Sequence, residues 1–270
     1  MGWRFAVSTL GLPSVPLAQA VRTAAAHDCE GIEIRAHPDE EVHCGMASAA
    51  VASARAVVAD AGLEIACLAG YAKVCAPGAD GPVIADLRAL ISLAYELGAP
   101  AVRVFPGGNG DPQPRIAAVL GELRDADVRL LVETHDSHPT GEAVRGIVEP
   151  FGQPDVVAAL WDAVHPWRAG ESPTRTREVL GEYLGYFQVK DAGAADPAPL
   201  LPGAGEVPLG ECGEVLRAWS GWVSLEWEKA WYPEIPPVEV ALEAAQRWLR
   251  RFGGFERRRA EPARGGEESR

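Results

Sequence analysis

The sequence has little lysine, few histidines and no paired cysteine motif, and each shortage narrows the classes of function to consider. Of its 270 residues, 25 are Lys or Arg and 38 are Asp or Glu, so the formal net charge is -13. Binding to a nucleic acid backbone or to an anionic membrane surface requires a basic face, and we expect neither partner. The five cysteines are odd in number, scattered and without a Cys-x-x-Cys pair, which is typical of reduced thiols in a cytoplasmic protein.

Long apolar runs and targeting segments are lacking too. Residues 1–4 lead directly into a strand-like segment without the pattern of a signal peptide. No hydrophobic run approaches the length of a membrane-spanning helix. We therefore expect a cytoplasmic protein that acts away from membranes.

What the sequence does contain is a regular alternation of strand-like and helix-like segments. Short apolar runs typical of buried strands alternate with segments in which apolar residues recur at a helical period. Strands are expected at 5–10, 31–35, 63–68, 101–105, 130–132, 156–160, 185–189 and 222–225. Helices are expected at 16–29, 47–61, 83–97, 116–125, 141–151, 174–184, 213–219 and 238–252.

Eight strand–helix units in about 250 residues are the signature of a (β/α)8 barrel. A doubly wound open sheet is the alternative, but it normally carries a Gly-x-Gly-x-x-Gly turn after its first strand, and Gly11-Leu12-Pro13 does not supply one. The charged segment at the end of the chain contains Gly and Pro and has no apolar period. The sequence thus predicts an α/β protein with a single (β/α)8 (TIM) barrel over 1–254 and a disordered tail over 255–270.

Four consecutive predicted strands end in side chains that carry oxygen. Glu133 follows the apolar run 130–132, and Asp162, Gln188 and Glu226 stand at the ends of the next three strands. Taken alone, Glu133 could simply mark where its strand leaves the core. In a closed barrel, however, the carboxyl ends of the strands converge on one mouth, so the four side chains are expected to surround one point.

Three ionised carboxylates around one point repel one another unless a cation lies between them. A divalent metal ion is the simplest such cation. Carboxylate and amide oxygens favour Mn²⁺ or Mg²⁺, and Co²⁺ or Zn²⁺ remain as alternatives. For Gln188, a hydrogen bond to a loop is the alternative role.

Lysine is rare in a chain whose default cation is arginine. The three lysines, Lys73, Lys190 and Lys229, all lie just past the ends of predicted strands. Because the lysine ammonium is a compact point charge, these positions suggest a charge placed for function, although three positions can also coincide by chance.

Other groups lie close to the expected mouth. His165, three residues after Asp162, is placed to contact a substrate, although an exposed loop histidine would fit the sequence as well. His135 could hold a metal ligand in place. Arg103 could bind a substrate oxygen or pair with an acid. The Gly-rich segment 203–206 is a weak phosphate-binding candidate, because it does not connect a strand to a helix N-terminus.

In this order, the strand-end motifs resemble the xylose-isomerase-like sugar phosphate isomerase/epimerase family over about residues 3–252. They read Leu131-Val132-Glu133-Thr134-His135, Trp161-Asp162-x-x-His165, Phe187-Gln188-Val189-Lys190-Asp191 and Val223-Ser224-Leu225-Glu226-Trp227-Glu228. The resemblance implies a TIM barrel in which a metal is held by Glu133, Asp162, Gln188 and Glu226, with His165 as a substrate contact. In the family the third ligand is more often His, and Gln is typical of hydroxypyruvate-isomerase-like relatives.

Two departures argue against the ketose-3-epimerase branch of that family. Ketose-epimerase-like relatives carry an Arg shortly after the third ligand, where residues 192–195 offer none. They also carry a further Glu after the first ligand, where this chain has Pro139.

The expected function is a metal-dependent sugar isomerase or epimerase, acting on a sugar, sugar phosphate or keto-sugar by proton abstraction next to a carbonyl through an enediolate. Glu133 and Glu226 are the expected catalytic base and acid. The residues expected to bind the carbohydrate substrate are His165, Lys190, Arg103, His135 and Glu228.

Other functions remain open. A dehydratase or lyase acting on a keto-sugar or inosose would begin from the same enolate. An endonuclease-IV-like phosphodiesterase would need a basic face and more metal-binding histidines than a chain with six in total provides. A non-catalytic sugar-binding barrel would not need every ligand. A homodimer or homotetramer is compatible with the sequence, which does not choose between them.

Overall fold

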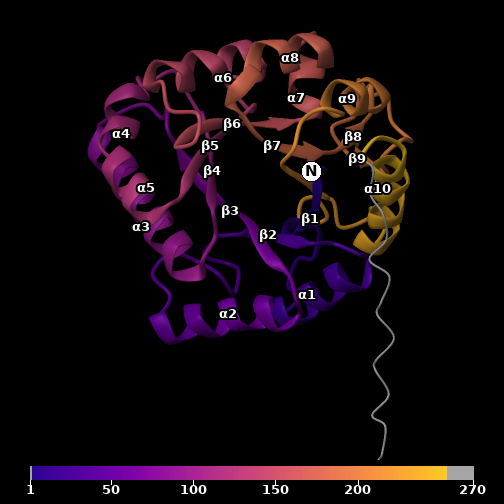
Figure 1. The fold of residues 1–270 in the computed structure, drawn as a ribbon, viewed down its shortest axis with the longest axis horizontal. Helices are drawn as coiled ribbons and strands as arrows, with labels where there is room; N and C mark the ends of the chain where they lie inside the picture. Colours follow the sequence, from indigo (N-terminus) through magenta and orange to yellow (C-terminus); the bar gives the residue numbers. More distant parts are fainter. Residues whose placement is uncertain (1, 254–270) are drawn as a thin grey trace, which may run out of the picture.

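Eight parallel strands close into a barrel in the computed structural model, which describes residues 2–253 (Figure 1). These strands are β1 Arg4–Ser8, β2 Gly31–Arg35, β3 Glu64–Lys73, β4 Ala101–Phe105, β5 Arg129–Glu133, β6 Val157–Asp162, β7 Leu184–Val189 and β10 Trp222–Leu225. Each strand pairs with the barrel strand before and after it in the chain, and β1 closes on β10. The predicted single (β/α)8 barrel is therefore confirmed, and the predicted tail over 255–270 lies outside the described residues.

Helices surround the barrel, as the view along it in Figure 1 shows. They are α1 Leu17–Ala26, α2 Ser48–Asp60, α3 Asp80–Leu97, α4 Gln113–Ala117, α5 Leu120–Ala126, α6 Gly141–Val148, α7 Val164–Arg168, α8 Pro173–Leu180, α9 Leu209–Leu216 and α10 Val238–Phe252. Short 3-10 turns are η1 Thr9–Gly11, η2 Glu149–Phe151 and η3 Gly181–Tyr183, and β8 Asp191–Ala192 pairs with β9 Pro199–Leu200 outside the barrel.

Side chains of the barrel strands alternate between two cores, because successive residues of a strand point to opposite faces. On β6, Val157, Ala159 and Trp161 pack outward against the helices. Ala158 and Leu160 point inward. The inward set forms a compact group, here called the inner apolar layer: Ala6, Ala66, Cys67, Ala101, Leu131, Ala158, Leu160 and Tyr186.

The inward alternation positions the site. Two residues after Leu131, Leu160 and Tyr186 come Glu133, Asp162 and Gln188, and two residues after Ala101 comes Arg103. Each of these polar side chains therefore points into the barrel one step nearer its mouth than the inner apolar layer. All four are buried.

Several predicted element boundaries were wrong. The helix expected at 116–125 is two short helices, α4 and α5, separated at Ala118–Val119. Helix α7, which begins two residues after Asp162, was missed, and β3 runs five residues further than expected, to Lys73. The helix expected at 213–219 is α9, which begins at Leu209.

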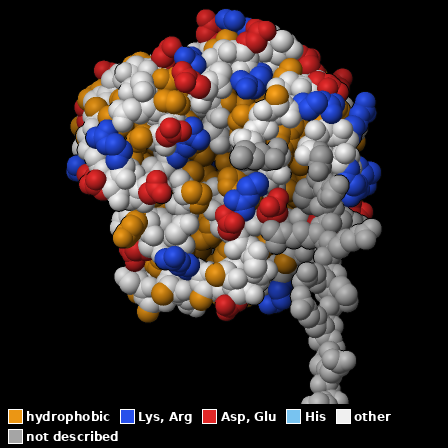
Figure 2. Space-filling view, viewed as in Figure 1, with side chains coloured by type: hydrophobic (Ala, Val, Ile, Leu, Met, Phe, Trp, Pro, Cys, Tyr) orange, Lys and Arg blue, Asp and Glu red, His pale blue; other side chains and the backbone are white. Residues whose placement is uncertain are grey.

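Figure 2 shows acidic and basic side chains mixed over the face viewed along the barrel. Within residues 2–253, no helix combines the length and apolar composition that crossing a membrane requires.

Candidate functional site

Three carboxylates meet at the carboxyl ends of the barrel strands. Glu133, Asp162 and Glu226 each offer an oxygen, and these oxygens lie within 4.8 Å of one another. All three side chains are buried, with exposed fractions of 1%, 0% and 4%. Three of the four side chains expected to surround one point thus converge. The buried polar groups at this mouth are here called the strand-end cluster: Glu33, Arg103, Glu133, Asp162, Gln188, Lys190 and Glu226.

Asp162 is oriented by the backbone that follows it. Its Oδ1 accepts hydrogen bonds from the backbone N–H groups of Val164 at 2.7 Å and His165 at 3.3 Å. Its own N–H donates to Thr134 Oγ1 at 3.0 Å, which connects the ends of β5 and β6. The second oxygen, Oδ2, lies 2.9 Å from the Lys190 ammonium.

Lys190 lies between the acidic side chains. Its Nζ is 2.9 Å from Asp162 Oδ2, 2.5 Å from Glu226 Oε2 and 2.8 Å from Glu228 Oε1. Lys190 lies two residues after Gln188, so its side chain points to the same, inward face and enters the barrel. The sequence predicted a role in substrate binding for Lys190 and Glu228, and here both take part in the ion-pair network.

Arg103 supplies the second buried cation. Its Nε lies 3.2 Å from Glu133 Oε2, and a terminal nitrogen lies 3.9 Å from Glu226 Oε1. Its guanidinium carbon is 4.1 Å from the centre of the Phe105 ring. Of the two roles considered for Arg103, pairing with an acid is the one that these contacts display.

Gln188 is held by carboxylates on two sides of the barrel. Its Nε2 donates to Glu33 Oε1 and to Glu226 Oε1, both at 3.1 Å. Its Oε1 is buried and has no hydrogen-bond partner among the described residues. A loop hydrogen bond, the alternative role considered for Gln188, is absent from the contacts of this side chain within residues 2–253.

Glu33 was missed by the sequence analysis. It is fully buried, and its Cα partners in the sheet are Ser8 on β1 and Cys67 on β3. An acidic residue between Ile32 and Ile34, in a segment expected to form a buried strand, was the signal that could have identified it. Lone acids inside buried strands need a partner, and Glu33 finds one across the barrel.

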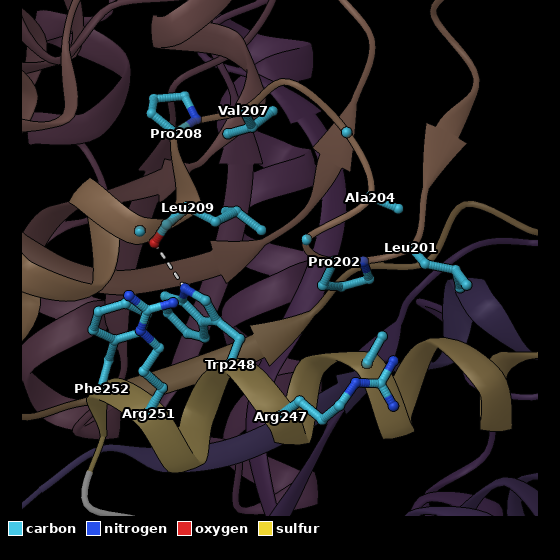
Figure 3. A pocket seen from close by; sticks show the side chains of 14 residues that line it. Leu201, Pro202, Ala204, Val207, Pro208, Leu209, Arg247, Trp248, Arg251 and Phe252 are labelled. Carbon is cyan, nitrogen blue, oxygen red and sulfur yellow. Dashed lines mark hydrogen bonds between the residues drawn. The ribbon is translucent and has the colours of Figure 1, made fainter.

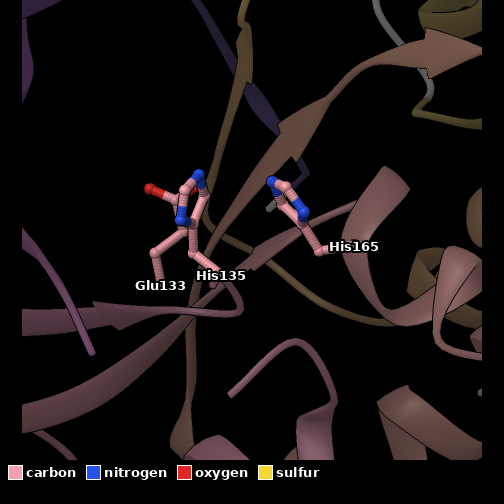
Figure 4. Close-up of side chains that lie close together, drawn as sticks. All are labelled: Glu133, His135 and His165. Atoms are coloured by element: carbon pink, nitrogen blue, oxygen red, sulfur yellow. The ribbon is translucent and has the colours of Figure 1, made fainter. Parts of the chain in front are cut away.

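Two histidines form a second group beside Glu133. Glu133, His135 and His165 each offer one donor atom within 4.8 Å of the others (Figure 4). The two rings lie 4.4 Å apart, centroid to centroid, in an edge arrangement. His165 Nε2 is buried without a hydrogen-bond partner among the described residues, and His135 Nδ1 lies 2.9 Å from Asp136 Oδ1. Both histidines predicted to bind substrate therefore reach the site.

The charges of the strand-end cluster do not balance. Four carboxylates, those of Glu33, Glu133, Asp162 and Glu226, face two cations, those of Arg103 and Lys190. If every group is ionised, two negative charges remain in a buried space, where uncompensated charge is costly.

The pKa directions reflect this imbalance. Burial, with a smaller effect of Glu226, raises the pKa of Glu33. Burial also raises the pKa of Glu133, in spite of Arg103. Burial opposes ionisation of Asp162 as well, but Lys190 and His165 outweigh it and lower that pKa to about 2.

A divalent cation fits this set of residues. It would neutralise the two excess charges. Its ligands would be carboxylate oxygens of Glu133, Asp162 and Glu226 and the Gln188 Oε1 atom, which has no partner in the described part of the chain. The Lys190 ammonium lies among the same oxygens, so it would have to share them with the ion or move toward Glu228.

The Gly-rich segment 203–206 does not form a phosphate cradle. The N–H groups of Gly203 and Gly205 donate to Asp191 Oδ2 at 2.8 and 3.0 Å, and the N–H of Val207 donates to Asp191 Oδ1 at 3.2 Å. A Cβ at Gly205 would lie 2.1 Å from Asp191 Oδ1, so this close approach requires glycine. The glycines therefore fasten the loop after β7 to the end of that strand.

A separate cavity of about 540 Å³ lies on the outer wall, between the loop 201–210 and helix α10 (Figure 3). Trp248 closes one side of it and donates from Nε1 to the Leu209 carbonyl at 2.7 Å. Arg247 and Arg251 also line this cavity. None of the strand-end carboxylates lines this cavity, so it is distinct from the mouth of the barrel.

The family follows from comparison with known proteins. The family model described as "Xylose isomerase-like TIM barrel" matches residues 21–252. This chain belongs to that family. The family predicted from the strand-end motifs is therefore confirmed. No curated protein sequence matches the chain.

Solved structures with the same fold include a probable 3-DHS dehydratase, AsbF from Bacillus anthracis, with 16% identity, TM-score 0.74, and coverage of 90% of this chain and 98% of that one. A D-psicose 3-epimerase is similar at 16% identity, TM-score 0.74, and coverage of 93% and 100%. An IOLI protein with a bound zinc atom is similar at 14% identity, TM-score 0.73, and coverage of 93% and 100%. A longer relative, a xylose isomerase-like TIM barrel/4-hydroxyphenylpyruvate dioxygenase fusion protein, is matched over 92% of this chain but 42% of its own length (20% identity, TM-score 0.74).

Proposed function

We propose that this chain is a divalent-metal-dependent isomerase or epimerase of a sugar or keto-sugar, which abstracts a proton next to a carbonyl through an enediolate. The observation that carries the proposal is the meeting of Glu133, Asp162 and Glu226 oxygens within 4.8 Å in a buried, negatively charged site. Membership of the xylose isomerase-like family and similarity to a D-psicose 3-epimerase support the substrate class.

Glu133, Asp162, Gln188 and Glu226 would hold the metal. A divalent ion bound there would act as a Lewis acid, polarising the substrate carbonyl and stabilising the developing negative charge. Mn²⁺ and Mg²⁺ suit the oxygen donors best, and Co²⁺ or Zn²⁺ would also bind. A structural relative with zinc supports the latter as alternatives.

The proton transfers fall to the chain's own carboxylates. Glu133 on β5 and Glu226 after β10 stand on different sides of the mouth, since β6 and β7 separate these strands in the barrel. One would remove the proton and the other would return it. Action from opposite faces of the carbon gives epimerisation, whereas return to the neighbouring carbon gives isomerisation.

Neighbouring groups would position the substrate and stabilise charge. Arg103 keeps a cation beside Glu133 as the proton moves. His165 Nε2, which has no hydrogen-bond partner within residues 2–253, would bind a substrate hydroxyl. The rings of Phe105 and His135 pack against each other beside these groups, with centroids 4.5 Å apart.

A screen for hydrogen exchange in heavy water tests the proposal. Ketoses, inososes and short hydroxy-keto acids are incubated with the metal-loaded and the metal-free protein. We expect deuterium at the carbon next to the carbonyl of at least one compound, with the loaded protein only. Absence of exchange across the panel, or equal exchange without metal, would overturn the proposal.

Dehydration is the second candidate, favoured by the similarity to a probable 3-DHS dehydratase. It would begin with the same proton abstraction and end with loss of a hydroxyl group from the next carbon. The same reactions would then show a new conjugated carbonyl absorbance and a product lighter by one water, which an isomerase or epimerase does not produce.

A further inference from the structure

Glu33 is the one buried carboxylate of the strand-end cluster that neither the metal nor the proton transfers employ. It lies on β2, whereas Gln188 lies on β7, and strands β1 and β10 separate the two around the barrel. The hydrogen bond from Gln188 Nε2 to Glu33 Oε1 at 3.1 Å therefore crosses the barrel interior. Because β2 and β7 are not neighbours in the sheet, backbone pairing of these strands does not account for this hydrogen bond.

The acceptors around Gln188 decide which way its carboxamide points. A carboxylate oxygen accepts hydrogen bonds and donates none, so the amide nitrogen must face Glu33 and Glu226. The opposite orientation would place the amide oxygen 3.1 Å from two anionic oxygens. The Gln188 Oε1 atom consequently points away from both acids, and it is buried without a partner among residues 2–253.

The two acceptors are not equivalent. Glu226 is a proposed metal ligand and proton-transfer group, so its oxygens would be committed to the ion and the substrate during reaction. Glu33 has no such duty and is fully buried on a sheet strand. It is thus the acceptor that remains available to fix the carboxamide when the site is loaded.

We propose that Glu33 is a positioning residue, which acts through Gln188 by holding its Nε2 so that Oε1 faces the metal. This inference rests on the metal-dependent function proposed above. It also explains why a neutral amide serves at this ligand position, since the carboxamide offers a donor to Glu33 and an acceptor to the ion at once. Outer partners of metal ligands typically contribute about 10- to 100-fold to metal affinity.

A double-mutant cycle on Mn²⁺ affinity tests the coupling. Calorimetric titration is performed on the wild-type protein, Glu33→Gln, Glu33→Met, Gln188→Ala and the double variant Glu33→Met/Gln188→Ala. We expect Glu33→Met to weaken Mn²⁺ binding about tenfold or more in the wild-type background. In the Gln188→Ala background the same change should alter affinity less than about twofold, because the group it orients is gone. Glu33→Gln, which keeps one acceptor oxygen, should fall between.

The cycle separates positioning from a general effect of charge or folding. If Glu33→Met weakens Mn²⁺ binding equally in both backgrounds, Glu33 acts through its charge or the fold, and the inference is wrong while the proposed function stands. An unchanged Mn²⁺ affinity in Glu33→Met would also make the inference wrong and leave the proposed function standing. Failure of the wild-type protein to bind Mn²⁺ overturns the proposed function and the inference together. Cys67→Ala, at the Cα partner of Glu33 on β3, is the matched control and should leave Mn²⁺ affinity unchanged.

Discussion

On β4 to β7 the inner apolar layer and the strand-end cluster share the same inward-facing rows of side chains. Arg103, Glu133, Asp162 and Gln188 each lie two residues after a layer residue on the same strand. In the layer, small and aliphatic side chains fill the barrel, with four alanines among its eight members. In the cluster, six of seven side chains are ionisable. The barrel interior is thus mainly apolar at the level of the inner apolar layer and mainly charged at the strand-end cluster, nearer the mouth.

The comparison separates stability from function. The inner apolar layer stabilises the fold through hydrophobic burial, which needs no particular partner. The strand-end cluster contains buried ion pairs, which contribute little net stability because desolvation offsets their attraction. We propose that the strand-end cluster serves binding or catalysis rather than stability, and the predictions below test that division.

Removing the metal should have the largest effect on activity, because the metal is bound by the strand-end cluster and not by the inner apolar layer. Extensive dialysis against a chelator should reduce hydrogen exchange into substrate to background, while the folded barrel persists. Added Mn²⁺ or Mg²⁺ should restore the rate. Exchange rates are followed by mass spectrometry and metal content by elemental analysis. Full activity in a demonstrably metal-free sample would contradict this prediction.

Replacing a proton-transfer carboxylate should have the next largest effect. Glu226→Gln keeps the shape of the side chain but removes its basic oxygen, and Lys190 loses one of its three acidic partners. Solvent deuterium incorporation should fall by roughly 10²-fold or more, the usual scale for a lost general base.

The control for Glu226→Gln is Glu142→Gln, an identical exchange on the outer helix α6 at a side chain 74% exposed, which should leave the rate unchanged. Deuterium incorporation at the wild-type rate in Glu226→Gln would restrict Glu226 to metal binding.

A substitution in the inner apolar layer should lower stability while leaving metal binding largely intact, the reverse of a change in the strand-end cluster. Leu160 is fully buried, two residues before Asp162. Leu160→Ala should lower the free energy of unfolding by about 2 kcal/mol or more, because it removes buried methyl groups and leaves a cavity. Mn²⁺ affinity of the folded protein should change far less. Denaturant unfolding and calorimetric titration measure the two quantities, and a loss of affinity without a loss of stability would show that the levels are not independent.

Much of the strand-end cluster was predictable from the sequence, because the alternation of inward and outward side chains along a strand is a local property. Glu133, Asp162 and Gln188 lie at the ends of apolar strands. In a closed barrel the carboxyl ends of the strands meet at one mouth, so these three side chains must converge. The ion-pair partners of Lys190 were not predictable, since three acids from two further strand ends compete for it in space. Glu33 was overlooked because its partner lies 155 residues away.

Errors in the outer layer have a different cause. Helix α7 spans five residues and contains Pro166, so its sequence gives no helical period to detect. The break between α4 and α5 falls at Val119, whose backbone leaves the helical region although its side chain is fully buried. Val119 belongs to the buried core, so the apolar pattern of 116–125 continues across the break and does not mark it.

The smallest expected effect is a change of metal preference at Gln188, the one cluster member without a charge. Gln188→His replaces an oxygen donor with a nitrogen donor, which suits Zn²⁺ and Co²⁺ better than Mn²⁺ or Mg²⁺. Zn²⁺ affinity should rise relative to Mn²⁺ affinity by about tenfold, on the scale of changes around metal sites. Gln188→Ala should weaken both metals. Because Zn²⁺ binds most such sites more tightly than Mn²⁺ in any case, the measured quantity is the ratio of the two affinities in competitive titrations. An unchanged Mn²⁺ affinity in Gln188→Ala would remove Gln188 from the metal ligands and leave its Oε1 without a partner.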